Sequence, residues 1–338
     1  MSTLTAVSPG PPSAMREARA PAWRTFAEAD LFAEAVAGAQ LAITPKQRAN
    51  GPWSLLPLAL ERGFVQFGDE PCATLTHGTV ARDVAGFGVA LTPADGYRMN
   101  GHAISGNVFA MFGPGAAYFA SSAAATRWAA VSFAPADLAS ALAALRGGDS
   151  PPLRTLFRPV FAAAPMATTI VGLLFATLRG VEREGAAYAS AIARNSLERA
   201  LLDAFAQAVN SAEEPPRADR VKLPATRLVR QCEEYLETRL ASPVYIAELC
   251  TLTGASERTL RNAFHTVYGV GPTRYLMQRR LANARRALRD ARHDDTVTSI
   301  ATRHGLWDLG RFAADYRVLY GEPPSATLRA SRARVMAA

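Results

Sequence analysis

The stretch TLTGASERTLRNAFHTVYG, residues 251–269, holds two helical patterns that are separated by one glycine. Leu249 and Leu252 lie at the spacing of one helix face, and Gly254 favours the left-handed conformation that ends a helix. Ser256 is placed to cap the next helix, because its hydroxyl can accept a hydrogen bond from a free amide of the first turn. The stretch therefore predicts a helix-turn-helix unit.

The second helix of this unit is expected to have one apolar face and one polar face. The residues predicted to be buried recur at helical spacing and are Leu260, Ala263, Phe264 and Val267. The polar residues on the other faces are Glu257, Arg258, Arg261, Asn262 and His265. A polar face on the second helix is what a helix-turn-helix unit presents to the major groove of DNA.

The same pattern recurs around Gly305. This glycine interrupts an apolar helical pattern, Asp308 can cap the next helix, and Phe312 and Tyr316 lie on its apolar face. The glycine and the first core residue are one position further apart than in the first copy. We interpret the two copies as an imperfect internal repeat.

Residues 272–291, PTRYLMQRRLANARRALRDA, connect the two copies. Pro272 suits the first position of a helix, and the apolar positions expected to face inward are Leu276, Leu281, Ala284 and Leu288. The arginines expected near solvent are Arg279, Arg280, Arg285, Arg286, Arg289 and Arg292. The segment therefore predicts a long helix that acts as a rigid spacer.

The positive charge of the chain lies in its last third. From Arg217 to the end there are 21 Lys and Arg against 12 Asp and Glu, whereas the first 216 residues have 16 against 17. A cationic domain suits binding to nucleic-acid phosphates, although many basic surfaces have no such role.

The front of the chain has the pattern of β structure. Short apolar runs such as 108–112 and 128–133 alternate with turn residues, which predicts a sandwich or barrel. One helix is expected before the strands, where Phe26, Phe32 and Val36 lie near helical spacing.

Two helices are expected after the strands, over residues 166–184 and 186–210. The second has an apolar stripe, which either packs within its own domain or forms a dimer contact. The stripe is formed by Ala193, Leu197, Ala200, Leu201, Ala204, Phe205 and Ala208.

About the last hundred residues resemble the DNA-binding domain of AraC/XylS-type transcriptional regulators. The resemblance lies in GASERTLRNAF, YGVGPTRYLMQRRLANARRAL and SIATRHGLWDLGRFAADYRVLYGEPPSATLR, which follow one another in the family's order. It also includes two Gly-x-x-Pro closings, Gly269 to Pro272 and Gly321 to Pro324. The front of the chain is similar, more loosely, to the cupin-like sensor domain of many members.

The resemblance implies an α+β multidomain fold. A cupin-like β-barrel or sandwich with flanking helices is expected to precede an all-α double helix-turn-helix domain. The expected divisions are a disordered tail (1–20), a cupin-like sensor domain (21–150), a helical segment that is a candidate for dimerisation (151–212), a linker (213–225) and the DNA-binding domain (226–338).

Carried over from the family, the base-reading positions of the first unit fall on Arg258, Arg261 and Asn262, with Glu257 and Thr259 beside them. Arginine can bond guanine O6 and N7 in pairs, and asparagine can pair with adenine in the same way. Ser256 can contact a phosphate as well as cap its helix.

The second unit departs from the family pattern. Its matching positions are Leu309, Gly310, Arg311, Ala313 and Ala314. Only Arg311 among them has a side-chain hydrogen-bonding group, so we expect an unequal reader. The first unit would specify bases, while the second would contribute Arg311, phosphate contacts or apolar contacts with thymine methyl groups. Leu306 stands where the family usually has Phe and keeps the apolar character.

The expected function is a sequence-specific DNA-binding transcription regulator with a ligand-sensing or dimerising front domain. The resemblance favours an activator, with RNA polymerase as partner, and repression by occlusion stays open. The other expected partners are double-stranded DNA, a small-molecule effector and a second copy of the chain. No membrane partner and a cytoplasmic location are expected, since every long apolar run contains a charge or a helix breaker.

Two alternatives stay open at this point. A cupin-type metalloenzyme would need two histidines and a carboxylate, and only His77 and His102 occur in the front domain. Such isolated histidines are more often core or surface residues, so no catalytic residue, metal ligand or cofactor is expected. The other alternative is an accessory DNA binder without an effector, whose front domain only dimerises. The aromatic residues that could line an effector pocket, or simply form core, are Trp53, Tyr97, Phe109, Tyr118 and Trp128.

The cysteines do not indicate a metal site. Cys72, Cys232 and Cys250 are far apart and share no spacing typical of metal ligands. They are expected to be buried free thiols.

Overall fold

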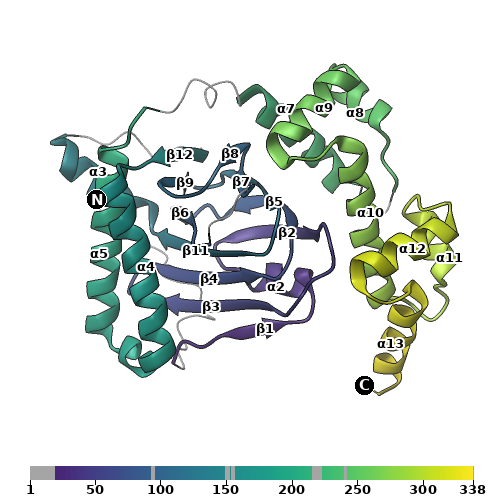
Figure 1. Ribbon diagram of the computed structural model, residues 1–338, viewed down its shortest axis with the longest axis horizontal. Coiled ribbons are helices and arrows are strands. Elements are labelled where there is room, and N and C mark those ends of the chain that lie inside the picture. The colour runs from purple at the N-terminus through teal and green to yellow at the C-terminus, as the bar shows by residue number, and fades with distance from the viewer. Residues whose placement is uncertain are drawn as a thin grey trace, which may run out of the picture.

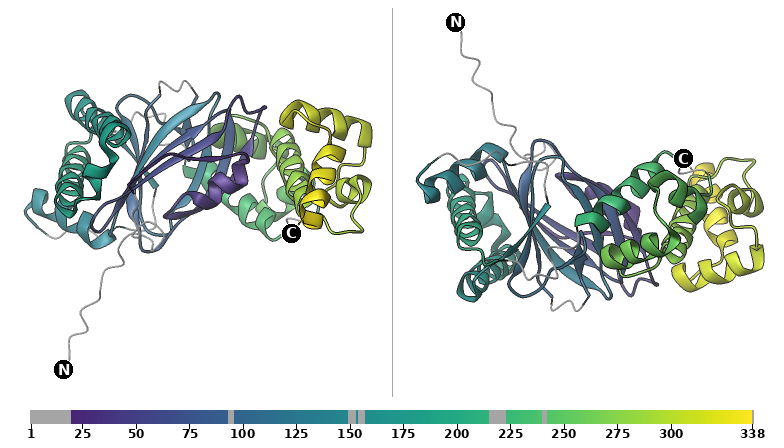
Figure 2. Two further views of the ribbon diagram at one scale, coloured as in Figure 1. Left: turned by 90° about the horizontal axis from the view of Figure 1, so that it is seen from below. Right: turned by 90° about the horizontal axis from the view of Figure 1, so that it is seen from above.

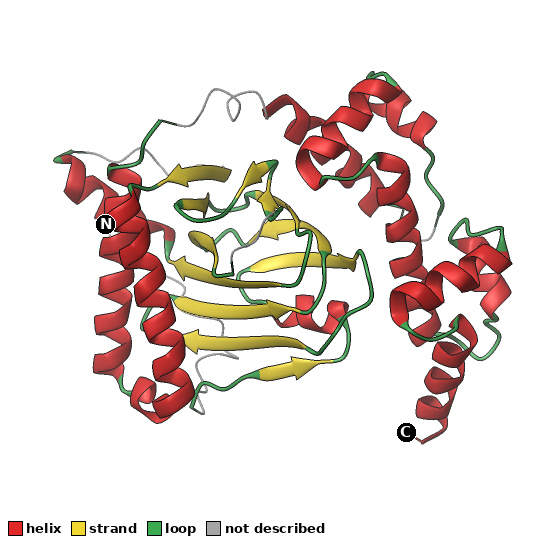
Figure 3. Cartoon of the chain, viewed as in Figure 1, coloured by secondary structure: helices red, strands yellow, loops and turns green. Residues whose placement is uncertain are grey.

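The computed structural model describes residues 20–92, 96–148, 153, 157–214, 223–239 and 242–337. Two β-sheets fill the front of the chain, and helices form its last third (Figure 3). The expected tail up to residue 19 and residues 215–222 of the expected linker lie outside the described residues.

The described strands form two antiparallel sheets that do not close into a barrel, so of the two expected forms the sandwich is confirmed. The seven-stranded sheet has the order β1 (Arg24–Phe26), β3 (Trp53–Ala59), β4 (Phe64–Glu70), β11 (Thr126–Phe133), β6 (Ala85–Ala90), β9 (Val108–Phe112) and β12 (Phe157–Phe161). The five-stranded sheet has the order β2 (Ala39–Pro45), β5 (Thr74–Val80), β10 (Ala117–Ser121), β7 (Arg98–Met99) and β8 (His102–Ala103).

Register decides which side chains of the five-stranded sheet face outward. In the antiparallel pair of β5 and β10, His77 lies opposite Phe119 and Leu75 lies opposite Ser121. Since alternate residues of a strand point to the same face, these four side chains share one face of the sheet. That face meets the carboxy-terminal domain.

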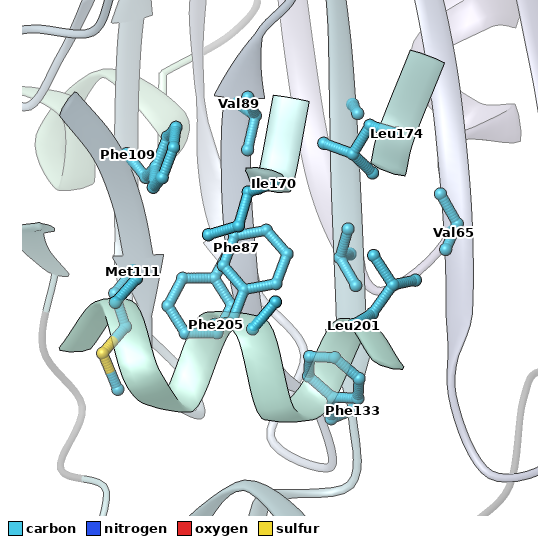
Figure 4. Close-up of a cluster of buried hydrophobic side chains, with 14 of the residues drawn as sticks. Val65, Phe87, Val89, Phe109, Met111, Phe133, Ile170, Leu174, Leu201 and Phe205 are labelled. Atoms are coloured by element: carbon cyan, nitrogen blue, oxygen red, sulfur yellow. The ribbon is translucent and has the colours of Figure 1, made fainter. Parts of the chain in front are cut away.

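Helices cover one face of the seven-stranded sheet. The helices of the front part are α2 (Ala29–Ala35), α3 (Pro135–Arg146), α4 (Ala164–Glu184), the 3₁₀ helix η1 (Gly185–Ala189) and α5 (Ala191–Asn210). Phe87 of β6 stacks on Phe205 of α5, with 4.3 Å between ring centroids, in the core that α3, α4 and α5 form with the sheet (Figure 4). The buried part of the α5 stripe, which includes Leu201 and Phe205, is therefore packing within the domain.

Two details of this region differ from the expectation. The segment 151–212 was expected to be helical, but it contains β12, which pairs with β9 at the edge of the seven-stranded sheet. Pro159 of β12 has no amide hydrogen to donate, and an edge strand tolerates this. Phe26, expected on the first helix, belongs to β1, whereas Phe32 lies in α2 and Val36 is the residue that ends it.

One helical stretch of the described residues, Ala164–Ala189, is long and apolar enough to cross a membrane by length and composition alone. In the structure its α4 part buries Ile170, Leu174 and Leu178 against the sheet. This is the packing of a core helix.

The elements described in the carboxy-terminal domain are all helices. Its helices are α7 (Leu223–Glu237), α8 (Ile246–Thr253), α9 (Glu257–Tyr268), α10 (Pro272–Arg289), α11 (Val297–Arg303), α12 (Leu309–Tyr320) and α13 (Pro324–Ala337). Residues 223–225, expected in the linker, already belong to α7. Figures 1 and 2 show α4 and α5 on one side of the sheets and this domain on the other.

Candidate nucleic-acid interface

The first helix-turn-helix unit is formed by α8 and α9 as expected. Gly254 follows α8 in the left-handed conformation, with φ of 65°. Ser256 caps α9, because its hydroxyl accepts a hydrogen bond from the Thr259 amide at 3.2 Å. Leu249 is buried, whereas Leu252, expected on the same face of this helix, is 47% exposed.

The apolar face of α9 is buried as expected, which orients the polar face outward. Leu260, Ala263, Phe264 and Val267 all belong to the core of this unit. The predicted reading residues are all exposed, namely Ser256, Glu257, Arg258, Thr259, Arg261 and Asn262. The structure thus brings them to one accessible surface, and their contact with DNA stays a prediction.

The charged residues on this surface are differently constrained. Arg261 donates to Glu257, one turn earlier, at 3.0 Å. Arg258 has no acidic group within ion-pair distance among the residues that the structure describes. Its guanidinium is therefore available for a base or a phosphate.

The second unit is formed by α11 and α12. Gly305 has φ of 72°, and the carboxylate of Asp308 caps α12 by accepting from the Arg311 amide at 2.9 Å. Phe312 and Tyr316 are buried, as expected, and so is Leu306.

The predicted reading positions of the second unit also face solvent. Leu309, Gly310, Arg311 and Ala314 are exposed, and Ala313 is half-buried. Arg311 lies 3.7 Å from Asp315, an exposed pair one turn apart. The surface offers one cation and several small or apolar groups, and the unequal reader expected from the sequence stays a prediction.

One exposed residue of the second unit was missed by the sequence reasoning. Trp307 stands immediately before the cap of α12 and is 65% exposed. The sequence signal that could have found it is a tryptophan next to the predicted cap Asp308. The neighbouring Leu306 already supplies the apolar core residue, so the tryptophan is not needed there.

The connecting helix α10 buries Leu276, Leu281, Ala284 and Leu288 as expected. Its arginines, however, do not all lie near solvent, and that expectation is wrong for three of them. Arg279 is only 7% exposed, and the side chains of Arg285 and Arg289 are each 14% exposed. They are covered because the front domain packs along α10.

Acidic residues at the start of α2 hold the second half of α10. Arg285 donates to both carboxylate oxygens of Glu28, through Nε at 2.8 Å and through Nη2 at 2.5 Å. Arg289 Nη1 lies 2.7 Å from both carboxylate oxygens of Asp30. Charge-assisted pairs of this kind are the stronger hydrogen bonds of proteins.

The outer face of the five-stranded sheet holds the first unit. Leu75 and Phe119 belong to the same buried cluster as the core of α7, α8 and α9. The hydroxyl of Ser121 donates to the Tyr268 carbonyl at 2.6 Å. The front domain therefore contacts both units while it leaves both reading surfaces exposed.

A buried polar cluster lies at the centre of this contact. Arg279 Nη1 donates to Glu233 Oε2 at 2.7 Å and lies 3.2 Å from His77 Nε2. Tyr268 donates to the other oxygen of Glu233 at 2.9 Å. Burial lowers the pKa of His77 to about 4, which the nearby Glu233 opposes only in part. His77 is therefore a neutral acceptor for Arg279 at neutral pH.

No group of three His, Cys, Asp or Glu side chains in the described ranges could hold a metal ion. His77 serves the domain contact, and Cys72 and Cys232 are buried free thiols as expected, whereas Cys250 is half-buried.

Two of the cavities that involve the front domain are lined by residues of the expected aromatic set. One, of about 80 Å³, lies between the two sheets and is lined by Tyr97, Tyr118 and Trp128. The other, of about 270 Å³, lies between the front domain and α10 and is lined by Trp53 and Tyr320 among others. The expected aromatic set is thus divided between two cavities, and Phe109 belongs to the core under α5.

Comparison with known proteins places the similarity in the helical part of the chain. A family described as "Helix-turn-helix domain" matches residues 249–330. Over 103 residues the chain is 35% identical to the XylDLEGF operon transcriptional activator of Pseudomonas putida and 36% identical to a probable thc operon regulatory protein of Rhodococcus erythropolis. Each match covers 30% of this chain, and they cover 32% and 31% of those relatives, so only about a third of their length is spanned.

A solved structure, that of a probable AraC family transcriptional regulator from Rhodopseudomonas palustris, is 40% identical to this chain. The match covers 31% of this chain and 97% of that chain, with a TM-score of 0.29. This score is too low to support a comparison of the folds.

Proposed function

We propose that this protein is a sequence-specific DNA-binding transcription regulator, because its carboxy-terminal domain belongs to the AraC/XylS family. The observation that carries the proposal is the pair of exposed reading surfaces, on α9 and α12, that are held by one connecting helix. Two recognition helices on a common support suit two successive major grooves on one face of DNA, about one helical turn apart.

The reading residues that we assign are those carried over from the family. In the first unit they are Ser256, Glu257, Arg258, Thr259, Arg261 and Asn262, and in the second they are Leu309, Gly310, Arg311, Ala313 and Ala314. The first unit specifies bases through Arg258, Arg261 and Asn262. The second makes weaker, largely apolar or phosphate contacts around Arg311.

Activation of transcription is the favoured mode, with RNA polymerase as the partner. The support is that relatives matching the helical domain are named transcriptional activators. A cytoplasmic location follows from action on the chromosome. Homodimerisation is proposed as well, and analytical ultracentrifugation of the full chain would test it.

We assign effector sensing to the front domain, and the cavity next to α10 is the better candidate site. Its volume of about 270 Å³ is close to the lower end of ordinary ligand pockets, whereas 80 Å³ between the sheets is well below it. The hydroxyl of Tyr320 in its wall is buried without a hydrogen-bond partner among the described residues. A ligand there would contact the front domain and the reading domain together.

A thermal-shift screen of metabolites tests the sensing proposal, because a ligand that binds the folded state must raise the melting temperature. The shift is expected to shrink in Tyr320→Phe and to persist in Tyr97→Phe, since Tyr97 lines the cavity between the sheets. The reverse pattern would move the site to that cavity.

Selection of genomic fragments by the purified full chain tests the regulatory proposal. A recurring motif of two half-sites about one turn apart is expected, with stricter base choice in one half-site. Salt-sensitive binding without any motif would leave only an accessory DNA binder.

A further inference from the structure

The two helix-turn-helix units meet directly at two turns that are far apart in the sequence. A Cβ atom built on Gly305, in the second unit, would lie 2.4 Å from Pro243 Cβ, which precedes α8 of the first unit. Two residues further along both segments, Trp307 Nε1 lies 3.5 Å from the hydroxyl of Tyr245. We call residues 243–245 and 305–307 the inter-unit junction.

Arg280 of α10 ties this junction to the connecting helix. Its Nη2 donates to the Val244 carbonyl at 2.8 Å, and its guanidinium carbon lies 5.1 Å from the centroid of the Tyr245 ring. The Cβ built on Gly305 would lie 3.7 Å from the same carbon. Three segments therefore converge on one guanidinium, and the close approach at Gly305 leaves no room for a larger residue.

The units have separate cores. Leu260, Phe264 and Val267 of the first belong to a cluster that includes the front domain, whereas Phe312 and Tyr316 of the second belong to another cluster. Each core is built on a different part of α10. The contacts of the inter-unit junction therefore add a direct link between the two units, beside α10 and the front domain.

Two side chains of the junction, those of Tyr245 and Trp307, are too exposed to serve as core. Trp307 is 65% exposed and Tyr245 is 48% exposed, whereas their neighbours Leu306 and Val244 are buried. Trp307 directly precedes the cap of α12, and Tyr245 directly precedes α8. The contact of Trp307 Nε1 with the Tyr245 hydroxyl therefore lies at the start of the second recognition helix.

We propose that Trp307 is a positioning residue that, through Tyr245, fixes the rotation between the two recognition helices and so sets the half-site spacing that the protein accepts. This inference rests on the proposed function, since it requires two half-sites. Moving one half-site by one base pair shifts it by about 3.4 Å and rotates it by about 35° around the DNA axis. Two recognition helices that are held rigidly bind an operator with such a changed spacing weakly. Two helices that can rotate relative to each other adapt to the changed spacing.

The test measures affinity for the selected operator and for versions with the half-sites one base pair closer or further apart. The wild-type protein is expected to lose about tenfold or more on each change, and Trp307→Ala less than about threefold. Val318→Ala is the matched control, because Val318 is 77% exposed on the same helix and should keep the wild-type pattern. An equal loss of affinity by Trp307→Ala at every spacing would indicate a direct DNA contact and overturn the proposal.

A measurement without DNA keeps the test independent of the proposed function. Spin labels at Thr266→Cys of α9 and Val318→Cys of α12, in a Cys250→Ser background, report the distance between the recognition helices. Trp307→Ala and Tyr245→Ala are each expected to broaden the distance distribution, and the double variant to broaden it no further. An unchanged distribution would refute the positioning role, even if the operator selection had already succeeded. A failed selection with a broadened distribution would instead refute the regulatory function alone.

Discussion

The guanidinium of Arg289 in α10 lies 2.7 Å from both carboxylate oxygens of Asp30 in the first turn of α2. These residues are separated by 259 positions in the chain, and they join the helix that connects the reading units to the front domain. Glu28 and Arg285 repeat the arrangement one turn away. These ion pairs therefore join α2 of the front domain to α10, away from the reading surfaces.

Removal of this ion pair should weaken the chain measurably. Arg289→Ala leaves the Asp30 carboxylate without its partner, and we expect a loss of about 1.5–3 kcal/mol in the free energy of unfolding. Denaturant titration measures it. Arg62→Ala is the control, since its pair with Asp137 is 3.0 Å long but Arg62 is 52% exposed, and such surface pairs contribute less than about 1 kcal/mol. Equal losses in both variants would show that the ion pair between α2 and α10 stabilises the chain no more than an exposed ion pair does.

Stability should fall in mild acid because of His77. Burial lowers its pKa to about 4 from the ordinary 6.5, so between these values the unfolded chain binds a proton that the folded chain does not. The free energy of unfolding should therefore decrease as the pH falls from 6.5 to 4, by up to about 3 kcal/mol.

His77→Gln should remove this part of the pH dependence, because an amide oxygen can accept from Arg279 without titrating. Denaturant titrations at pH 5 and pH 7 compare the two proteins. His293→Gln, at a fully exposed site, should leave the wild-type dependence intact. If His77→Gln kept the same slope, other groups would have to cause the acid sensitivity.

The turn of the first unit should depend on the backbone of Gly254. A Cβ at this position would meet no atom within 4 Å, so the effect of Gly254→Ala comes only from its φ of 65°. We expect a loss of about 1–2 kcal/mol in the free energy of unfolding. Gly172→Ala in α4 also meets no atom but has an ordinary helical backbone, and it should be neutral or stabilising. A loss in both variants would contradict the left-handed turn.

Arg258 should contribute base discrimination in the first half-site. Arg258→Ala is expected to lower affinity for the selected operator and to reduce the penalty for one mismatched base pair by about 1–3 kcal/mol. Arg230→Ala, an exposed arginine of α7, should leave that penalty unchanged. Competition binding with single-mismatch operators measures both. A uniform weakening on all sequences would make Arg258 a phosphate contact instead.

The second half-site should be less strict than the first. Arg311 is the single predicted reading residue of α12 with a hydrogen-bonding side chain, so Arg311→Ala should abolish most of the remaining base preference there. The same mismatch series measures this preference. If the second half-site proved as strict as the first in the wild-type protein, the unequal reader would be wrong.

The helix-turn-helix units could be predicted from the sequence because their determinants are local. Gly254, Ser256, Gly305 and Asp308 each act on neighbouring residues of the chain, through a left-handed turn or a cap. The apolar spacing of α9 then leaves its polar face outward, and the structure has these features where they were expected.

Tertiary contact decided what the local pattern could not. Whether Arg279 and Arg289 lie in solvent depends on what packs against α10, and helical spacing alone says nothing about a domain that is distant in the sequence. An alternating strand pattern places His77 on one face of its sheet, but it does not say which residue packs against it. The contact of Tyr245 with Trp307 likewise depends on the tertiary structure. The sequence by itself determined the two reading helices, since caps and periodicity act within a few residues. Only the tertiary structure decided how those helices are held, because long-range packing and ion pairing depend on the whole fold.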